Sequence, residues 1–245
     1  MYVWLRKLLY LMPPETAHRM TLQTLDWIPS LCFPKPLGRS LSCMGLTFAH
    51  PVGLAAGLDK NAEHVTALGK LGFSFIEVGT VTPEPQEGNP SPRLFRLLED
   101  EALINRMGFN NRGVDYLVHQ VSQHSYSGVL GINIGKNKNT PLEKSADDYC
   151  LALSKVFRWA DYVTINISSP NTPDLRRLQE EHFFDALLDR VIAQRKELAE
   201  VHQRWVPLAV KLSPDENDEQ LKRLAGIITD KGIEAIIATN TTDLN

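Results

Sequence analysis

Polar side chains follow each of six short apolar runs in the part of the chain after residue 50. The runs span residues 52–56, 75–78, 129–134, 162–167, 208–212 and 235–238. The polar segments at or after their ends are 55–60, 79–82, 133–136, 166–172, Lys211 and 239–242. One polar residue in such a place is usually a turn or cap residue, but a set that follows all six runs indicates a common site.

The residue types in these segments favour a flat polar ring that carries negative charge. Asparagine amides both donate and accept hydrogen bonds, so several of them around one cavity suit a ring with alternating N–H and C=O groups. Lysines such as Lys60 and Lys211 suit an anionic group on the same ligand, or charge that develops during a reaction. Asp59 is the only carboxylate of the set.

The segment from residue 105 to 111, Asn-Arg-Met-Gly-Phe-Asn-Asn, is a second candidate. Its composition is compatible with a plain turn. It is equally compatible with a substrate loop whose amides reach the same ligand, and the residues alone leave both interpretations open.

Several common site types lack support. None of the seven histidines lies at the end of an apolar run and there is no H-E-x-x-H motif, so we expect no metal centre. No G-x-G-x-x-G follows any run, which argues against a dinucleotide fold of the Rossmann type. With 26 basic and 29 acidic residues, the net charge of −3 gives no basic footprint for nucleic acid.

The elements that must position these residues follow an alternating pattern. The six runs are mostly rich in Val and Ile and too short for helices, so they are interpreted as buried strands. Apolar faces with helical spacing lie between them at 114–121, 149–156, 184–191 and 221–228. Ser145 and Asp148 predict a capping box at the start of the second helix. This alternation predicts an α/β fold with parallel strands and crossover helices.

Six strands leave two architectures open, either an open six-stranded sheet or an eight-stranded barrel that lacks its last quarter. The 245 residues approach the length of a whole barrel. The leading segment and the long stretch 83–127 use up part of that length, and no linker divides the body into two domains.

Residues 1–40 differ from the body by an amphipathic helical pattern. Apolar residues at helical spacing occupy positions 5, 8, 9 and 12 and, after Pro13-Pro14, positions 22, 25 and 28. Such faces are compatible with packing on the body, and also with a membrane interface, where Trp and Tyr are favoured. No stretch approaches 18 uncharged apolar residues, so we expect no transmembrane span.

Three cysteines, Cys32, Cys43 and Cys150, are too few and too widely spaced for a disulfide framework or a zinc knuckle. We expect buried, reduced thiols and a cytosolic compartment. The apolar core of the N-terminus, residues 8–12, is too short for a signal peptide.

Together these segments resemble the dihydroorotate dehydrogenase family, the FMN enzymes of pyrimidine synthesis. The resemblance extends from about residue 2 to the last residue and is carried by segments 53–60, 105–111, 166–172 and 238–242. It implies a (β/α)8 TIM barrel, with six of the eight strands in this chain. The implied boundaries are 1–40 for a helical membrane and quinone segment and 41–245 for the FMN-binding barrel.

The resemblance also implies a class. A serine at the Ser169 position and a helical N-terminal extension mark the quinone-linked, membrane-associated enzymes, whereas a cysteine would mark the soluble class that uses fumarate or NAD. The implied partners are dihydroorotate and orotate, and a membrane quinone, either ubiquinone or menaquinone. The implied location is peripheral, on the cytoplasmic face of the inner membrane.

Individual roles follow from the resemblance. The positions that match those holding FMN are Ala56, Gly57, Leu58, Asp59, Lys60, Thr80, Asn133, Asn166, Lys211 and Thr239. The positions that match those around dihydroorotate are Lys60, Asn105, Arg106, Met107, Gly108, Phe109, Asn166, Asn171, Asn240 and Thr241. Ser169 matches the base that removes the C5 proton, while the C6 hydride goes to the flavin and a quinone then reoxidises it.

A serine hydroxyl is a poor base, so the implied role requires either a partner that passes the proton on, for which we expect Thr172 or a water, or proton transfer in concert with hydride departure. The family continues through two further strands whose loops bind the FMN phosphate, so we expect these 245 residues alone not to hold FMN tightly. One alternative is an FMN barrel acting on another pyrimidine, which Ser169 and the amide-rich loop disfavour. Another is an inactive truncated barrel that only binds a membrane or a partner.

Overall fold

The computed structural model describes residues 6–7, 9–33, 38–172 and 175–242. Its main sheet has five parallel strands in the order of the chain. They are β3 (Phe75–Val81), β6 (Val129–Ile134), β7 (Tyr162–Asn166), β8 (Leu208–Lys211) and β9 (Ala235–Ile237). The predicted strand 52–56 contributes only a parallel bridge from Leu54 to Ile76, beside β3. The predicted parallel α/β architecture is confirmed.

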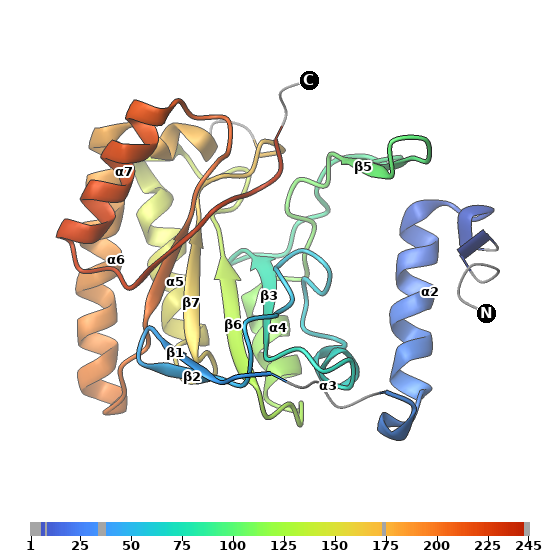
Figure 1. Ribbon diagram of the computed structural model, residues 1–245. Helices are drawn as coiled ribbons and strands as arrows, with labels where there is room; N and C mark the ends of the chain where they lie inside the picture. The colour runs from blue at the N-terminus through green and yellow to red at the C-terminus, as the bar shows by residue number, and fades with distance from the viewer. Residues whose placement is uncertain (1–5, 8, 34–37, 173–174, 243–245) are drawn as a thin grey trace.

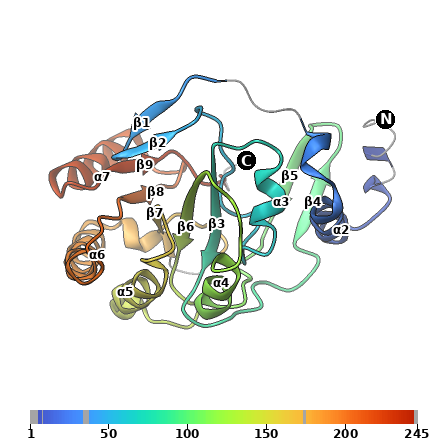
Figure 2. The same cartoon turned by 90° about the horizontal axis from the view of Figure 1, so that it is seen from below.

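Burial on both faces explains why the strands are nearly continuous apolar runs. Every residue of β6 and of β7 is buried, which is the pattern expected when helices cover one face of a parallel sheet and a core fills the other. The sheet follows a curve with the crossover helices outside it (Figure 2). Within the described residues the curve stays open between β3 and β9, so five strands and one bridge form an incomplete barrel wall.

Four helices of the body, among the described residues, cover the predicted apolar faces, and a fifth and short one at residues 65–69 was not predicted. Their bounds are α3 (Val65–Gly69), α4 (Val114–Val121), α5 (Ser145–Val156), α6 (Glu181–His202) and α7 (Asp218–Asp230), with 3-10 turns η2 (Leu142–Lys144) and η3 (Leu175–Gln179). Asn217 caps α7 by accepting a hydrogen bond from the Gln220 backbone N–H at 2.9 Å. In Figure 1 the longer crossover helices lie together on one side of the sheet.

The predicted capping box at Ser145 is wrong. The 3-10 turn η2 leads directly into α5, so Ser145 is already helical and its hydroxyl donates to the Leu142 carbonyl at 2.6 Å. Asp148 instead accepts a hydrogen bond from the Asn137 backbone N–H at 2.8 Å, and so ties the loop after β6 to α5.

Two antiparallel hairpins were not expected from the sequence. The first joins β1 (Leu41–Cys43) to β2 (Leu46–Phe48), and Phe48 packs with Val129 and Tyr162 at the amino ends of the main strands. The second joins β4 (Leu94–Leu97) to β5 (Ala102–Asn105), within the long stretch after β3. All four strands are three or four residues long and partly exposed, so they lack a clear apolar run.

The helix α2 (Pro14–Trp27) lies on the side of the molecule away from α5 to α7 (Figure 1). Pro14 occupies its first turn, where a missing N–H costs nothing. Leu22 and Leu25 are buried against the main core, so this part of the predicted packing is present. Residues 6, 7, 9 and 10 are helical, but positions 5 and 8 of the first predicted face lie outside the described residues. A short 3-10 turn, η1 (Ser30–Cys32), follows α2.

The cysteine prediction is only partly right. All three thiols are free, but Cys32 and Cys43 are exposed and only Cys150 is buried. No helix within the described residues has the length and apolar character needed to cross a membrane.

Candidate active site

A cavity of about 910 Å³ lies at the carboxyl ends of the strands, the edge of a parallel sheet where sites are built. The residues predicted for the site that line it are Ala56, Gly57, Leu58, Lys60, Asn105, Met107, Gly108, Phe109, Thr80, Asn166, Ser169, Asn171, Lys211, Asn240 and Thr241. They come from six separate segments of the chain. The segment 105–111 therefore contributes to the same cavity as the strand ends, which favours the substrate-loop interpretation over a plain turn.

Two of the predicted site residues have other contacts. The Asp59 carboxylate accepts hydrogen bonds from the backbone N–H groups of Glu63 and His64, at 2.9 and 2.7 Å, and so anchors the start of α3. Burial raises the pKa of Asp59, and these N–H groups partly offset the effect. The Arg106 guanidinium donates to the Pro92 carbonyl at 2.8 Å and does not line the cavity.

Two further predicted site residues, Asn133 and Thr239, lie behind or beside the cavity. Asn133 is fully buried and sits behind Thr80, whose hydroxyl donates to the Asn133 side-chain oxygen at 2.5 Å. Thr239 is exposed, and its hydroxyl donates to the Asn240 carbonyl at 3.1 Å. The roles assigned to these residues stay predictions.

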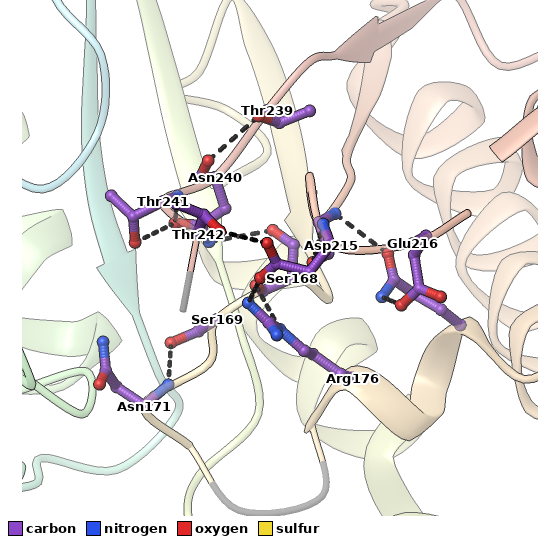
Figure 3. Close-up of polar contacts among 12 residues, drawn as sticks. Ser168, Ser169, Asn171, Arg176, Asp215, Glu216, Thr239, Asn240, Thr241 and Thr242 are labelled. Carbon is purple, nitrogen blue, oxygen red and sulfur yellow. Dashed lines mark hydrogen bonds and ion pairs between the residues drawn. The ribbon is translucent and has the colours of Figure 1, made fainter. Parts of the chain in front are cut away.

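The loop that carries Ser169 is tied to the loops after β8 and β9 (Figure 3). Ser169 is buried, and its Oγ accepts a hydrogen bond from the Asn171 backbone N–H at 3.3 Å. The neighbouring Ser168 hydroxyl accepts from the Asn240 amide at 3.0 Å. Arg176 binds Asp215 at 2.7 Å, which links the segment after the loop to the one after β8. Ser169 therefore stands in a braced loop at the cavity wall.

Thr172 is the nearest candidate for a proton relay along the chain. Its Oγ1 is buried and has no hydrogen-bond partner among the described residues. A buried hydroxyl without a partner is costly, so an additional group or water at this position would be stabilised. The structure places no direct hydrogen bond between the side chains of Ser169 and Thr172 in the described part of the chain.

Two lysines supply positive charge to the cavity. Lys60 Nζ donates to the Asn110 side-chain oxygen at 2.6 Å. Burial, followed by the nearby Arg93 guanidinium, lowers the pKa of Lys60 to about 8. The residue Lys211 is only 8% exposed, and its side-chain Nζ has no hydrogen bond or ion pair within the described residues. A lysine nitrogen that opens onto a cavity and has no protein partner in the described part of the chain fits an anionic ligand.

The backbone at Gly57 leaves room for a flat ligand. Gly57 has φ of 112°, a conformation that favours glycine. A Cβ built on it meets no atom within 4 Å, because it points into open space. Together with the amide side chains and Lys211, this open wall fits a flavin ring system. Among the described residues, no group of three or more His, Cys, Asp and Glu is placed to hold a metal.

The same cavity extends away from the strand ends into an apolar branch. This branch lies between α2 and the β4–β5 hairpin and is lined by Leu9, Tyr10, Ala17, His18, Leu22, Leu25, Leu94, Arg96 and Leu103. Arg96 joins the two sides, because it donates to the Met12 carbonyl at 2.9 Å and lies 5.3 Å from the centre of the Tyr10 ring. One continuous space therefore connects a polar end with an apolar end.

Sequence reasoning missed several polar residues behind the cavity, including Glu77, Ser168 and Arg176. Glu77 had a signal, because it is a charged residue within the apolar run 75–78. A charge in a strand that is buried on both faces has to be paired or hydrogen-bonded. Arg176 carried no such signal, since an arginine after a loop is usually exposed.

Comparison with known proteins places this chain among close relatives. The family described as dihydroorotate dehydrogenase matches residues 40–245. A protein named dihydroorotate dehydrogenase (quinone) from Legionella pneumophila (strain Lens) is 58% identical over 242 residues, covering 99% of this chain and 73% of the relative. A protein of the same name from Enterobacter sp. (strain 638) is 52% identical, covering 98% and 73%. The crystal structure of DHODH in complex with ferulenol from Eimeria tenella matches with a TM-score of 0.84 and 38% identity, covering 95% of this chain and 68% of that one.

Proposed function

The chain belongs to the dihydroorotate dehydrogenase family, and from its site we propose that it oxidises dihydroorotate to orotate, with FMN as hydride acceptor and a quinone as final acceptor. The observation that carries the proposal is the single cavity with a polar end at the strand ends and an apolar end at α2. Such a cavity suits two substrates of opposite polarity, one polar and one apolar. The alternative of an inactive remnant has no support among the named relatives, all of which are dehydrogenases.

The polar end matches the chemistry of dihydroorotate, a ring with two carbonyls, two N–H groups and a carboxylate. Asn105 and Asn171 are hydrogen-bonded to each other at 3.3 Å, and both line the cavity. Amides fixed in this way orient a ring without needing charge, while the Lys60 ammonium attracts the carboxylate. The loop 105–111 and the segment after β9 would hold the substrate between them.

Ser169 is the residue proposed to take the C5 proton. When bound, FMN supplies the acceptor for the hydride that leaves C6, so the substrate loses one proton and one hydride. Loss of the proton to a serine requires onward transfer. Thr172, with its buried and unpartnered Oγ1 three residues further on, is the side chain proposed to relay the proton: it would accept a proton from Ser169, through a water or after a small shift of the loop, and release its own hydroxyl proton to water.

The residues that would hold FMN follow the predicted set, with Gly57, Thr80, Asn166 and Lys211 in the cavity wall. Asn133 would act from behind Thr80. The Lys211 ammonium would stabilise negative charge that gathers on the ring during hydride transfer.

The apolar branch is proposed as the quinone site, and residues 1–40 as the segment that brings it to the membrane. Trp27 and Leu31 are 87% and 97% exposed, at and just after the end of α2. Exposed apolar residues on an amphipathic helix favour a lipid interface. We propose peripheral attachment on the cytoplasmic face of the inner membrane, with residues 41–245 as the FMN-binding barrel.

The test is anaerobic reduction of the flavin in the holoenzyme. Dihydroorotate is expected to bleach the flavin absorption, and a long-chain quinone to restore it. 5,6-Dihydrouracil, which has the ring but lacks the carboxylate, serves as the matched control and is expected not to reduce the flavin. Reduction by dihydrouracil without reduction by dihydroorotate would instead assign the chain to another pyrimidine.

A further inference from the structure

Glu77 is a buried carboxylate that the proposed mechanism does not use. It lies in the middle of β3, is 4% exposed and does not line the cavity. It accepts hydrogen bonds from Asn133 Nδ2 at 2.8 Å, from the Tyr162 hydroxyl at 2.9 Å and from the Thr164 hydroxyl at 2.9 Å. Burial, and then the charge of Glu77, raise the pKa of Tyr162, so its phenol keeps its proton and donates.

The carboxylate fixes which way the neighbouring groups point. Because a carboxylate only accepts, the Asn133 amide turns its NH2 toward Glu77 and its oxygen away. That oxygen accepts the Thr80 hydroxyl proton at 2.5 Å. Thr80 has no second proton to donate, so its oxygen accepts from the Asn166 amide N–H at 2.8 Å.

The hydrogen-bond network continues into the loops at the cavity wall, where Figure 3 shows the contact between Ser168 and Asn240. The Asn166 side-chain oxygen accepts from the Ser168 backbone N–H at 3.2 Å and from its hydroxyl at 3.0 Å. The Ser168 oxygen in turn accepts from the Asn240 amide at 3.0 Å. The Asn240 oxygen accepts from the Thr241 backbone N–H at 2.8 Å. Between Asn240 and Glu77, every side-chain donor therefore points toward the carboxylate.

The hydrogen bonds within the network determine which donor or acceptor groups the Asn166 and Asn240 amides still have for a ligand. Asn166 and Asn240 have each used their oxygen and one of their two N–H groups. The remaining N–H of each is a donor. A donor suits the carbonyl, carboxylate or ring-nitrogen acceptors of a flavin or a dihydroorotate ring, whereas a reversed amide would present an oxygen to them.

We propose that Glu77 is a positioning residue that sets the hydrogen-bond direction of this network, so that Asn166 and Asn240 present donors to the bound rings. Reversal of the Asn133 amide would place its oxygen against the carboxylate oxygen. The network therefore has one direction as long as a carboxylate stands at position 77. The inference rests on the proposed function for the identity of the rings.

Three variants of the holoenzyme test the proposal, with orotate affinity read from the flavin spectrum and FMN affinity read from flavin fluorescence. Glu77→Met removes the acceptor at similar size, and we expect both dissociation constants to rise about tenfold or more. Glu77→Gln leaves a single oxygen, which the two hydroxyl donors of Tyr162 and Thr164 favour on their side. Its NH2 then faces Asn133 and reverses that amide, so we expect both constants to rise about tenfold here too. Tyr162→Phe with Thr164→Val removes the other two donors and is the control for a general loss of stability.

A second comparison avoids an apolar residue at position 77. Glu77→Gln combined with Tyr162→Phe and Thr164→Val removes the two donors that hold the glutamine oxygen away from Asn133, so part of the affinity lost in Glu77→Gln alone is expected to return. The proposal is overturned if Glu77→Met binds as the parent does, or if the Tyr162–Thr164 control loses as much affinity as Glu77→Met. If the parent holoenzyme binds no orotate, the proposed function fails instead.

Discussion

The two ends of the cavity are built in opposite ways. At the strand ends, polar side chains are buried and joined by hydrogen bonds, and Ser168 and Asn166 are almost inaccessible to solvent. At the other end, α2 and the β4–β5 hairpin expose large apolar side chains such as Met20, Trp27 and Leu103. The first end fixes geometry for a small polar substrate. The second offers an apolar surface that requires little directional bonding.

This difference indicates a division of labour. Chemistry that moves a proton and a hydride depends on placement to within a fraction of an ångström, so the strand ends carry a braced network. A long hydrophobic acceptor needs access and burial of apolar surface, which is not directional. Substitutions at the two ends should therefore affect different half-reactions.

The largest effect is expected from Ser169→Ala in the holoenzyme. Loss of a general base typically slows the step by about 10²–10⁴-fold, so flavin reduction by dihydroorotate should slow to that extent while FMN stays bound. Stopped-flow absorbance measures it. Ser122→Ala, on an exposed serine at the end of α4, is the matched control. An unchanged reduction rate would remove Ser169 from the mechanism.

Deleting residues 1–40 is expected to affect only the second half-reaction. Flavin reduction by dihydroorotate should stay within about twofold, while turnover with a long-chain quinone in vesicles should fall about tenfold, equivalent to ~1.4 kcal/mol of lost binding. Leu22 and Leu25 leave with the segment, so a thermal melt must show that the body remains folded. If vesicle binding and quinone turnover both survive, α2 serves only as packing.

A pH effect of intermediate size is expected at the polar end. Lys60 has a pKa of about 8, lowered by burial and by Arg93. It is charged below that pH and becomes neutral above it, so attraction for the substrate carboxylate is present at pH 7 and lost as the pH rises. Between pH 7 and 9 the charged fraction falls about tenfold, and kcat/KM for dihydroorotate should follow it. Lys60→Arg stays charged and should abolish this inflection; an inflection that persists in it belongs to another group.

The architecture was largely readable from the sequence, because buried parallel strands leave apolar runs that are hard to mistake. The strand ends also indicated which side chains line a common cavity, while the ring expected to bind there stays a prediction. The hairpin of β4 and β5 could not be predicted in the same way, since both strands are short and half exposed and β4 packs against α2, which lies far away in the sequence.

The network behind the site was equally hidden from sequence reasoning. The direction of the Asn133 amide depends on Glu77, 56 positions earlier in the chain, and only the register of β3 beside β6 brings the two together. Ser145 likewise has the sequence pattern of a helix N-cap. Only the structure shows that the 3-10 turn η2 leads directly into α5, so that Ser145 is already helical. Local patterns thus predicted elements, while long-range contacts decided side-chain roles.

The smallest effect on stability is expected at the exposed end of α2, in Trp27→Ser. Trp27 is 87% exposed, so its replacement should change the free energy of unfolding by less than about 0.5 kcal/mol. Binding to anionic vesicles should nevertheless weaken measurably, because an interfacial tryptophan contributes to lipid affinity and not to the core. Leu22→Ala on the same helix is the comparison variant with the opposite expectation. Because Leu22 is buried, its truncation should lower the free energy of unfolding by about 2–5 kcal/mol. Equal vesicle binding by the parent and Trp27→Ser, measured by co-sedimentation, would mean that the exposed apolar end of α2 is not the membrane contact.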